Sequence, residues 1–295
     1  MPPAKSWLKW TAIGLGSVVG LVVVLVLSLQ AASLVKQSKR YAIPQEQLAL
    51  TALPDLARGE HLVKLECVGC HGDNLDGHVF FSTFAMGTLY SRNLTKGTGG
   101  IGRTFSTADF VRAIRYGVGP DGHTVLFMPT NAFEHFSDAD LASIIAYVQQ
   151  VSPVDHDVPL PQIGPMARIL TVLTPFPLFS AEQVEKNPNR VMPSPSDTVA
   201  FGSYLAHIAG CLECHGPTLA GGGGGGTNIT PGGPLGKWTE ADFMRAIKEG
   251  KRPDGTAIPE TMPWKDMSRM SDQELDAVWQ YVHSVPPVTP PPKKS

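Results

Sequence analysis

The sequence Cys-Val-Gly-Cys-His at residues 67–71 recurs as Cys-Leu-Glu-Cys-His at residues 211–215, and these pentapeptides contain all four cysteines of the 295-residue chain. A CxxCH motif is the attachment signature of c-type haem: two thiols form thioethers to the porphyrin, and the adjoining histidine coordinates the iron. Cysteines three positions apart on a helical turn present both sulfurs on one side. The motifs therefore predict two covalently bound haem c groups. The thioether and histidine positions are Cys67, Cys70, His71, Cys211, Cys214 and His215.

Three other roles use a pair of close cysteines, namely a redox dithiol, half of a structural zinc site and a disulfide. None of them needs a histidine directly after the second cysteine in two separate places. A four-cysteine zinc site would have to join motifs 144 positions apart. Covalent haem is therefore the favoured interpretation.

The motifs lie in an internal repeat. Residues 105–117, FSTADFVRAIRYG, correspond to residues 238–250, WTEADFMRAIKEG. Three shorter pairs follow in the same order: Pro-Asp-Gly at 120–122 and 253–255, Met-Pro at 128–129 and 262–263, and SDADL or SDQEL at 137–141 and 271–275. The repeat predicts two similar domains, each with its own haem.

Helix signals recur in both copies. Ser106 and Thr239 are expected N-caps of a middle helix, and Ser137 and Ser271 are expected to open the last helix. No alternating strand pattern of useful length appears, so we expect an all-α fold. Units of about a hundred residues are short for a self-sufficient core. The buried porphyrins should therefore supply much of the apolar mass, and haem-free protein should be poorly folded.

The sixth iron ligand decides the chemistry, because a filled coordination sphere favours electron transfer and an open one admits peroxide or dioxygen. Met128 and Met262 are the candidates, since both precede a proline at equivalent places in the two copies. Methionine opposite histidine raises the reduction potential, which favours a carrier of single electrons. The rivals, none of which recurs at its counterpart position, are Met86, Met267, Met270, His123 and His207.

The N-terminal region is a candidate membrane helix. Residues 10–35 carry no charge, and a helix of this length is long enough to cross a hydrocarbon core of about 30 Å. Trp7 and Trp10 are candidate interfacial anchors. A cleaved signal peptide is the alternative, because residues 30–32 resemble a weak cleavage site, but the apolar stretch exceeds the usual length. We expect an uncleaved anchor. The flanking lysines and arginine do not decide its orientation.

Charge is unevenly distributed. Beyond residue 40 the chain has 26 acidic and 19 basic residues, a net charge of −7. Such a surface suits a soluble partner with a lysine-rich docking patch, although solubility alone explains it equally well. No basic patch with interleaved aromatic residues points to nucleic acid. We find no acid/base pair, nucleophile constellation or dinucleotide motif in the sequence. We therefore do not expect the polypeptide itself to be an enzyme.

The segments between and after the repeats differ in composition. Residues 158–197 are rich in proline and are expected to hold the two haems in a fixed relation, with a short helix around 166–173. A membrane contact of residues 169–179 is an open alternative role. Six glycines at 221–226 are expected to form a flexible loop, and residues 288–295 a disordered tail.

Family resemblance rests on GTLYSRNLT at 87–95, ADFVRAI at 108–114, and the Pro-Asp-Gly and Met-Pro segments. With these residues the chain resembles a membrane-anchored dihaem class I cytochrome c, and it is similar to the cytochrome c subunits of membrane-bound alcohol, gluconate and related sugar dehydrogenases. The resemblance implies Met128 and Met262 as distal ligands and haem attachment outside the cytoplasmic membrane. We expect an anchor at 1–40, tandem class I cytochrome c-like domains at 41–157 and 198–287, and a linker at 158–197.

The expected function is transfer of single electrons in a respiratory chain, on the periplasmic face of the cytoplasmic membrane. The expected donor is a membrane dehydrogenase or quinol-oxidising complex, and the acceptor is a soluble cytochrome, a cupredoxin or a terminal oxidase. One alternative is a cytochrome c subunit of a membrane-bound dehydrogenase or oxidase complex. A further alternative is a dihaem peroxidase, which would need a vacant position on the iron.

Overall fold

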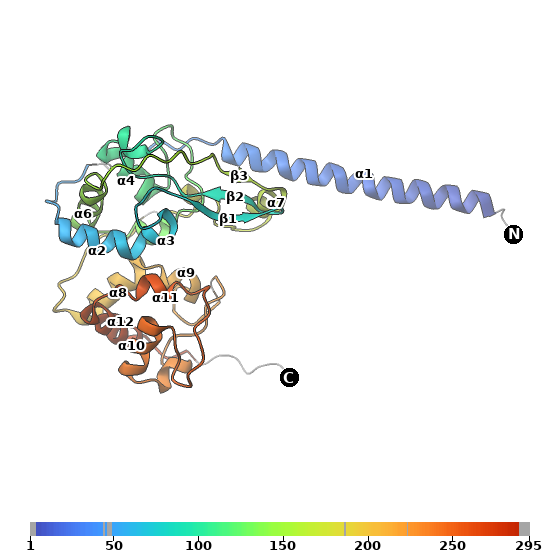
Figure 1. The fold of residues 1–295 in the computed structure, drawn as a ribbon. Coiled ribbons are helices and arrows are strands. Elements are labelled where there is room, and N and C mark those ends of the chain that lie inside the picture. The colour runs from blue at the N-terminus through green and yellow to red at the C-terminus, as the bar shows by residue number, and fades with distance from the viewer. Residues whose placement is uncertain (1–3, 44, 46–48, 186, 223, 289–295) are drawn as a thin grey trace.

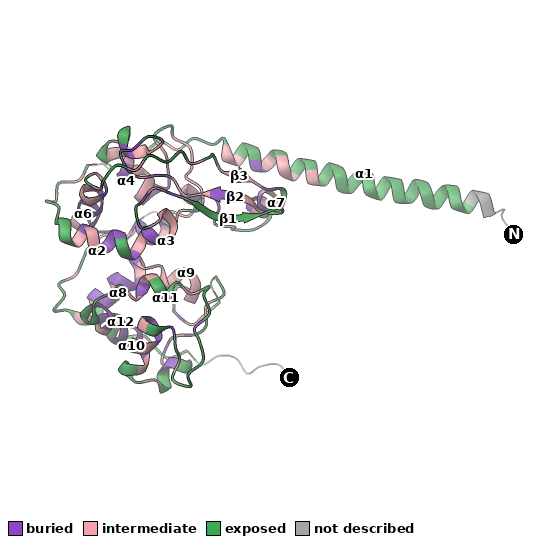
Figure 2. Cartoon of the chain, in the orientation of Figure 1, coloured by how far each residue is buried: buried purple, intermediate pink, exposed green. Residues whose placement is uncertain are grey.

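The computed structural model describes residues 4–43, 45, 49–185, 187–222 and 224–288. One long helix, α1 (Ala4–Gln37), extends away from two helix-rich domains (Figure 1). It is exposed over most of its length, whereas buried residues concentrate inside the two domains (Figure 2). By length and composition α1 is the one helix among the described residues that is able to cross a membrane. The expected disordered tail lies, except for Val288, outside the described residues.

Domain 1 is built around the crossing of its first and last helices. Its elements are α2 (Leu56–Glu66), α3 (Val68–His71), η2 (Ile101–Arg103), α4 (Thr107–Tyr116), α5 (Thr130–Phe133) and α6 (Asp138–Val148). Gly59 of α2 lies directly on α6, where a Cβ atom would overlap the carbonyl oxygen of Ser143. The two backbones therefore approach more closely than any residue with a side chain allows.

Domain 2 repeats this plan. Its elements are α8 (Thr198–Ile208), α9 (Cys211–His215), η4 (Pro234–Lys237), α10 (Glu240–Glu249), α11 (Trp264–Met267) and α12 (Asp272–Ser284). Gly202 of α8 lies on α12 as Gly59 lies on α6, because a Cβ atom there would overlap the carbonyl oxygen of Ala277. The structure thus has two helix-rich domains of the same architecture, as the repeat predicted.

The expected helix caps are present in both copies. Ser106 and Thr239 each accept a hydrogen bond from the backbone N–H three residues later and form capping boxes. Ser137 and Ser271 cap α6 and α12 in the same way. These caps satisfy backbone donors that would otherwise lack a partner at each helix start.

A small sheet, which the sequence did not predict, projects from domain 1. Strands β1 (Val79–Thr83), β2 (Gly87–Tyr90) and β3 (Gln162–Ile163) pair antiparallel in the order β1-β2-β3. Every residue of β1 is exposed, so burial imposes no alternating pattern on it. The sheet instead depends on a distant pairing, in which the proline-rich segment supplies β3.

The proline-rich segment packs largely on domain 1. It contains α7 (Pro165–Leu173), in agreement with the expected short helix, and η3 (Ser180–Glu182). Leu178 and Phe179 are buried against Leu89 of β2 and Ala167 of α7. The segment therefore forms an ordered layer between α1 and the first domain.

Candidate haem sites

The motif of domain 1 lies where α2 ends and α3 begins. Cys67 separates the two helices, and His71 ends α3. The Nδ1 atom of His71 lies 2.8 Å from the carbonyl oxygen of Arg92. A carbonyl only accepts, so Nδ1 donates and the lone pair of the neutral ring is on Nε2, the atom left for a metal. Burial lowers the pKa of His71, which favours this neutral form.

The motif of domain 2 has the same geometry on α9. The Nδ1 atom of His215 donates to the carbonyl oxygen of Thr227, at 2.7 Å. His71 and His215 therefore present the same ring nitrogen for ligation. The chemistry of each donor set fits haem c, since two neighbouring thiols precede an imidazole whose orientation is fixed by a backbone carbonyl.

An asparagine turn positions each of these carbonyl groups. Asn93 follows Arg92, and its Nδ2 atom donates to the carbonyl oxygen of Val154 at 2.8 Å. Asn228 follows Thr227 and donates in the same way to Val288, at 2.6 Å. Each asparagine also accepts from the N–H two residues later, at 2.9 Å. An Asn-x-Thr segment that recurs in both domains thus holds the carbonyl groups that orient His71 and His215.

The four cysteines lie partly buried and form no disulfide with one another. Burial is the main cause that raises the pKa of Cys70 to about 11 and that of Cys211 to about 12. It also raises the pKa of Cys67 and of Cys214. A redox dithiol reacts as the thiolate, so this environment disfavours that role.

Met128 and Met262 occupy equivalent places, one residue before the proline that opens α5 or α11. Both are partly buried against the hydrophobic core. The carbonyl oxygen of Met128 accepts from Thr130 N–H at 2.7 Å, and that of Met262 accepts from Trp264 N–H at 2.8 Å. The two methionine loops therefore have matching backbone conformations, and they carry the side chains expected to be distal ligands.

The rival ligands have other contacts. Met267 and Met270 belong to the buried core, and Met86 packs near Leu89. The Nδ1 atom of His123 lies 3.0 Å from an Asp121 carboxylate oxygen, and that of His207 lies 2.7 Å from the carbonyl oxygen of Ser203. No pair of rivals is equivalent in the two domains.

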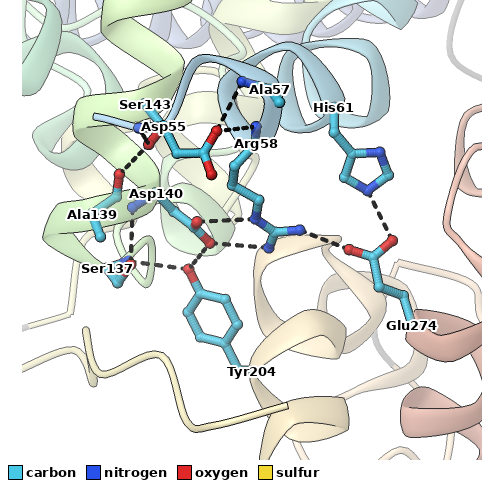
Figure 3. A network of polar contacts seen from close by, with 10 residues as sticks. All are labelled: Asp55, Ala57, Arg58, His61, Ser137, Ala139, Asp140, Ser143, Tyr204 and Glu274. Atoms are coloured by element: carbon cyan, nitrogen blue, oxygen red, sulfur yellow. Dashed lines mark hydrogen bonds and ion pairs between the residues drawn. The ribbon is translucent and has the colours of Figure 1, made fainter. Parts of the chain in front are cut away.

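The two domains meet through equivalent faces (Figure 3). His61 and Tyr204 each stand two residues after a crossing glycine, and Asp140 and Glu274 each stand three residues after a capping serine. His61 Nε2 lies 2.8 Å from a Glu274 carboxylate oxygen, and Tyr204 OH donates to Asp140 at 2.7 Å. Each domain thus gives the other the same pair of positions. Such reciprocal contacts between equivalent positions are typical of a two-fold arrangement.

Arg58 of domain 1 adds contacts to this interface that domain 2 does not repeat (Figure 3). Its Nε and Nη2 atoms donate to Asp140 at 3.0 and 3.1 Å, and its Nη1 atom donates to Glu274 at 2.7 Å. Burial by itself would raise the pKa of Glu274. Hydrogen bonds from His61, the Ser271 N–H and Arg58 outweigh burial and lower that pKa to about 2. Sequence reasoning missed this network, because no motif marks residues that meet only across the interface.

The same arrangement brings each CxxCH motif against the methionine loop of the other domain. Asn131, three residues after Met128, donates to Glu213 of the second motif. In the first motif, a Cβ atom on Gly69 would overlap the carboxylate of Asp266, four residues after Met262. The two candidate haem sites therefore adjoin each other at the centre of the molecule.

Comparison with known protein families shows which class of protein this chain belongs to. Residues 56–152 match the family model described as cytochrome c, and residues 204–282 match that described as cytochrome c oxidase, cbb3-type, subunit III. These matches contain both CxxCH motifs and both methionine loops. The chain is a c-type cytochrome with two cytochrome c domains, and such domains bind haem c covalently.

Three proteins to which this chain is similar are cytochrome subunits of dehydrogenases. The chain is 29% identical over 265 residues to the fructose dehydrogenase cytochrome subunit of Gluconobacter japonicus. This alignment covers 79% of this chain and 53% of the relative. It is 30% identical over 269 residues to the cytochrome c subunit of the quinone alcohol dehydrogenase of Gluconobacter oxydans, with 79% and 55% covered. It is 29% identical over 271 residues to the gluconate 2-dehydrogenase cytochrome c subunit of Pantoea cypripedii, in an alignment that covers 77% of this chain and 59% of the relative. The chain spans between half and three-fifths of the length of these relatives.

Proposed function

We propose that this electron-transfer protein carries two haem c groups and passes single electrons between them. The observation that supports it most directly is the matched pair of imidazoles, each held by a backbone carbonyl with Nε2 left for iron. Bound haem supplies a one-electron redox centre in each domain. Cys67, Cys70, Cys211 and Cys214 hold the two groups, His71 and His215 are the proximal ligands, and Met128 and Met262 are the distal ligands.

The interface supports electron exchange inside one molecule. Glu213 of the second motif contacts the Met128 loop, and Gly69 of the first motif lies against Asp266. Arg58 and its carboxylate partners hold this arrangement. Because the domains are fixed rather than tethered, the separation of the two redox centres stays constant, as transfer over a short distance requires.

The proposed setting is the outer face of the cytoplasmic membrane, with α1 as the anchor. Domain 1 adjoins α1, so we propose that electrons enter from a membrane-bound dehydrogenase near domain 1 and leave from domain 2. The relatives are cytochrome subunits of fructose, alcohol and gluconate dehydrogenases, which supports a dehydrogenase as the donor. A soluble cytochrome, a cupredoxin or a terminal oxidase remains the proposed acceptor. The domain boundaries at 41–157, 158–197 and 198–287 belong to this proposal.

The ligand assignment is tested by replacing each methionine separately. In Met128→Ala and in Met262→Ala, half of the ferric haem should become high-spin, and the midpoint potential of that haem should fall. Met86→Ala is the matched control, and it should leave the spectrum and both potentials unchanged. If neither variant differs from the control, methionine ligation is wrong. Efficient turnover of hydrogen peroxide by the unaltered protein would favour the peroxidase alternative instead.

Purification from detergent-solubilised membranes tests the partner. A stoichiometric flavin- or quinone-containing subunit that stays bound through size-exclusion chromatography is the expected result for a dehydrogenase subunit. Recovery of the cytochrome alone, still able to accept electrons from added dehydrogenase, would identify an independent carrier.

A further inference from the structure

The freely projecting part of α1 has the length of a bilayer core. Residues 7–25 are exposed throughout, and Val26 is the first residue of the helix to lose exposure to the folded domains. At about 1.5 Å per residue these 19 residues extend about 28 Å. The hydrocarbon core of a bilayer is about 30 Å thick. Trp7 and Trp10 are the expected interfacial anchors, and a hydrocarbon core of about 30 Å that begins at residue 10 ends near residue 29. The folded part of the protein therefore begins close to where the membrane would end.

Side-chain hydrogen bonds fix the depth at which α7 sits along α1. Gln30 Nε2 donates to the carbonyl oxygen of Pro165 at 2.8 Å. One turn further on, the hydroxyl groups of Ser33 and Thr171 lie 3.0 Å apart, and Lys36 Nζ donates to the Thr171 carbonyl oxygen at 2.7 Å. The helix that emerges from the membrane is thus bound along one side to α7.

The tip of the β1–β2 hairpin is held at the same depth. The N–H of Met166 donates to the carbonyl oxygen of Ala85 at 3.0 Å, and the N–H of Gly164 donates to that of Met86 at 2.9 Å. Pro165, the partner of Gln30, lies between these two donors. Figure 1 shows the hairpin and α7 on the side of domain 1 that faces along α1 toward its N-terminus.

This side of domain 1 exposes large apolar side chains. We call it the hairpin surface, and it consists of Phe80, Phe81, Phe84, Met166 and Leu173. Phe84 is 99% exposed and Leu173 is 63% exposed. No charged residue occurs between residues 79 and 91, so nothing in the hairpin sequence opposes an apolar environment. Exposed apolar patches of this kind mark interaction sites.

We propose that the hairpin surface rests in the outer interfacial layer of the membrane that α1 crosses, with lipid as its partner. Gln30 directly follows residue 29, so it lies at the boundary between the hydrocarbon core and the headgroup layer. Aromatic residues favour this layer. The inference depends on the proposed membrane anchor, and it adds a second attachment point. Two attachment points prevent domain 1 from rotating about α1, so the first motif keeps one orientation toward a membrane-bound donor.

Site-directed spin labelling of the full-length holoprotein tests this proposal. The four native cysteines form thioethers, so the label reacts with an introduced cysteine at Phe84→Cys or Leu173→Cys. Leu53→Cys is the matched control, since Leu53 is 90% exposed and precedes α2 at the other end of domain 1 (Figure 1). The protein is reconstituted into phosphatidylcholine and phosphatidylglycerol vesicles.

Relative to the control, both test sites should show a several-fold higher ratio of oxygen accessibility to accessibility by a water-soluble nickel chelate. Vesicle flotation in the same samples tests the anchor separately. If the protein floats but both test labels are as open to the nickel chelate as the control, the hairpin surface does not contact lipid and the anchor stands. If the protein does not float, both the anchor and the lipid contact are wrong. The haem spectrum would still report on the redox proposal.

Discussion

The two domains hold their motif histidines in the same way but connect them to the asparagine turn differently. Between His71 and Arg92, domain 1 inserts the β1–β2 hairpin, whereas between His215 and Thr227 domain 2 has the shorter run of glycines. The histidine, the carbonyl that orients it and the asparagine that follows are equivalent in both. The segment between these groups differs in the two domains, and in domain 1 it contains a hairpin with exposed apolar residues.

Two glycines of the segment in domain 2 lie close to neighbouring backbone. A Cβ atom on Gly226 would overlap the carbonyl oxygen of Cys214, and Gly221 has a φ of +88°, in the left-handed region. The loop of domain 2 therefore lies directly on its own motif. The hairpin of domain 1 instead extends away from its motif toward α1.

The largest effect should come from removing the thioether sites of one domain. Cys211→Ser combined with Cys214→Ser should remove half of the covalent haem and leave domain 2 poorly folded, because the domain loses a large part of its apolar core. The pair Cys67→Ser and Cys70→Ser should have the same effect on domain 1. Haem per chain and helical circular dichroism measure both outcomes. A full haem complement in either double variant would show that the replaced cysteines do not hold the haem of that domain.

A smaller loss is expected from Arg58→Met, which removes the guanidinium group that contacts a carboxylate of each domain. It leaves Asp140, whose side chain is 2% exposed, without its charged partner. Breaking a buried ion pair in this way costs about 3 kcal/mol. Guanidinium unfolding should show a lower midpoint and separate transitions for the two domains.

Lys64→Met in the same helix is the control for Arg58. Lys64 pairs with Glu60 on the surface, with side chains 56% and 46% exposed. Such pairs contribute less than about 1 kcal/mol. Equal losses in the two variants would mean that Arg58 does not join the domains.

Gly59→Ala and Gly202→Ala test whether the two helix crossings are equally tight. Each added methyl group meets a carbonyl oxygen of the facing helix, so each should lower the free energy of unfolding by about 1–3 kcal/mol. Ser203→Ala, next to Gly202, should change it little. Chemical denaturation of the three variants measures this, and a loss in only one domain would show that the crossings differ.

The smallest effect should be a dependence on acid at the interface. The pKa of Glu274 is lowered from 4.5 to about 2, so its stabilising contribution is complete above pH 4.5 and is lost as the pH falls through about 2. Unfolding free energies measured between pH 5 and 2 should fall less steeply in Glu274→Gln. Parallel pH profiles for the variant and the unaltered protein would contradict this assignment.

Local signals in the sequence predicted the helix caps, and the candidate haem residues that they marked lie at equivalent places in the two domains. The CxxCH spacing, the capping serines and the Met-Pro pairs act over a few residues, and repetition in two copies separated them from chance. The Arg58 network and the small sheet were not predictable in this way. Arg58 and Glu274 are 216 positions apart, and β2 pairs with β3 of the proline-rich segment, so both features depend on contacts between distant parts of the chain. Asn93 and Asn228 are intermediate cases, because an Asn-x-Thr segment recurs in both copies of the sequence but only the fold shows its role.

The most direct test of the central claim is the intact mass and reduced spectrum of the purified full-length chain. We predict a mass increase equal to two haem groups that resist extraction with acidified acetone, and a low-spin c-type spectrum from both. A mass without haem, or with haem in one domain only, would contradict the assignment of one redox centre to each half of the molecule.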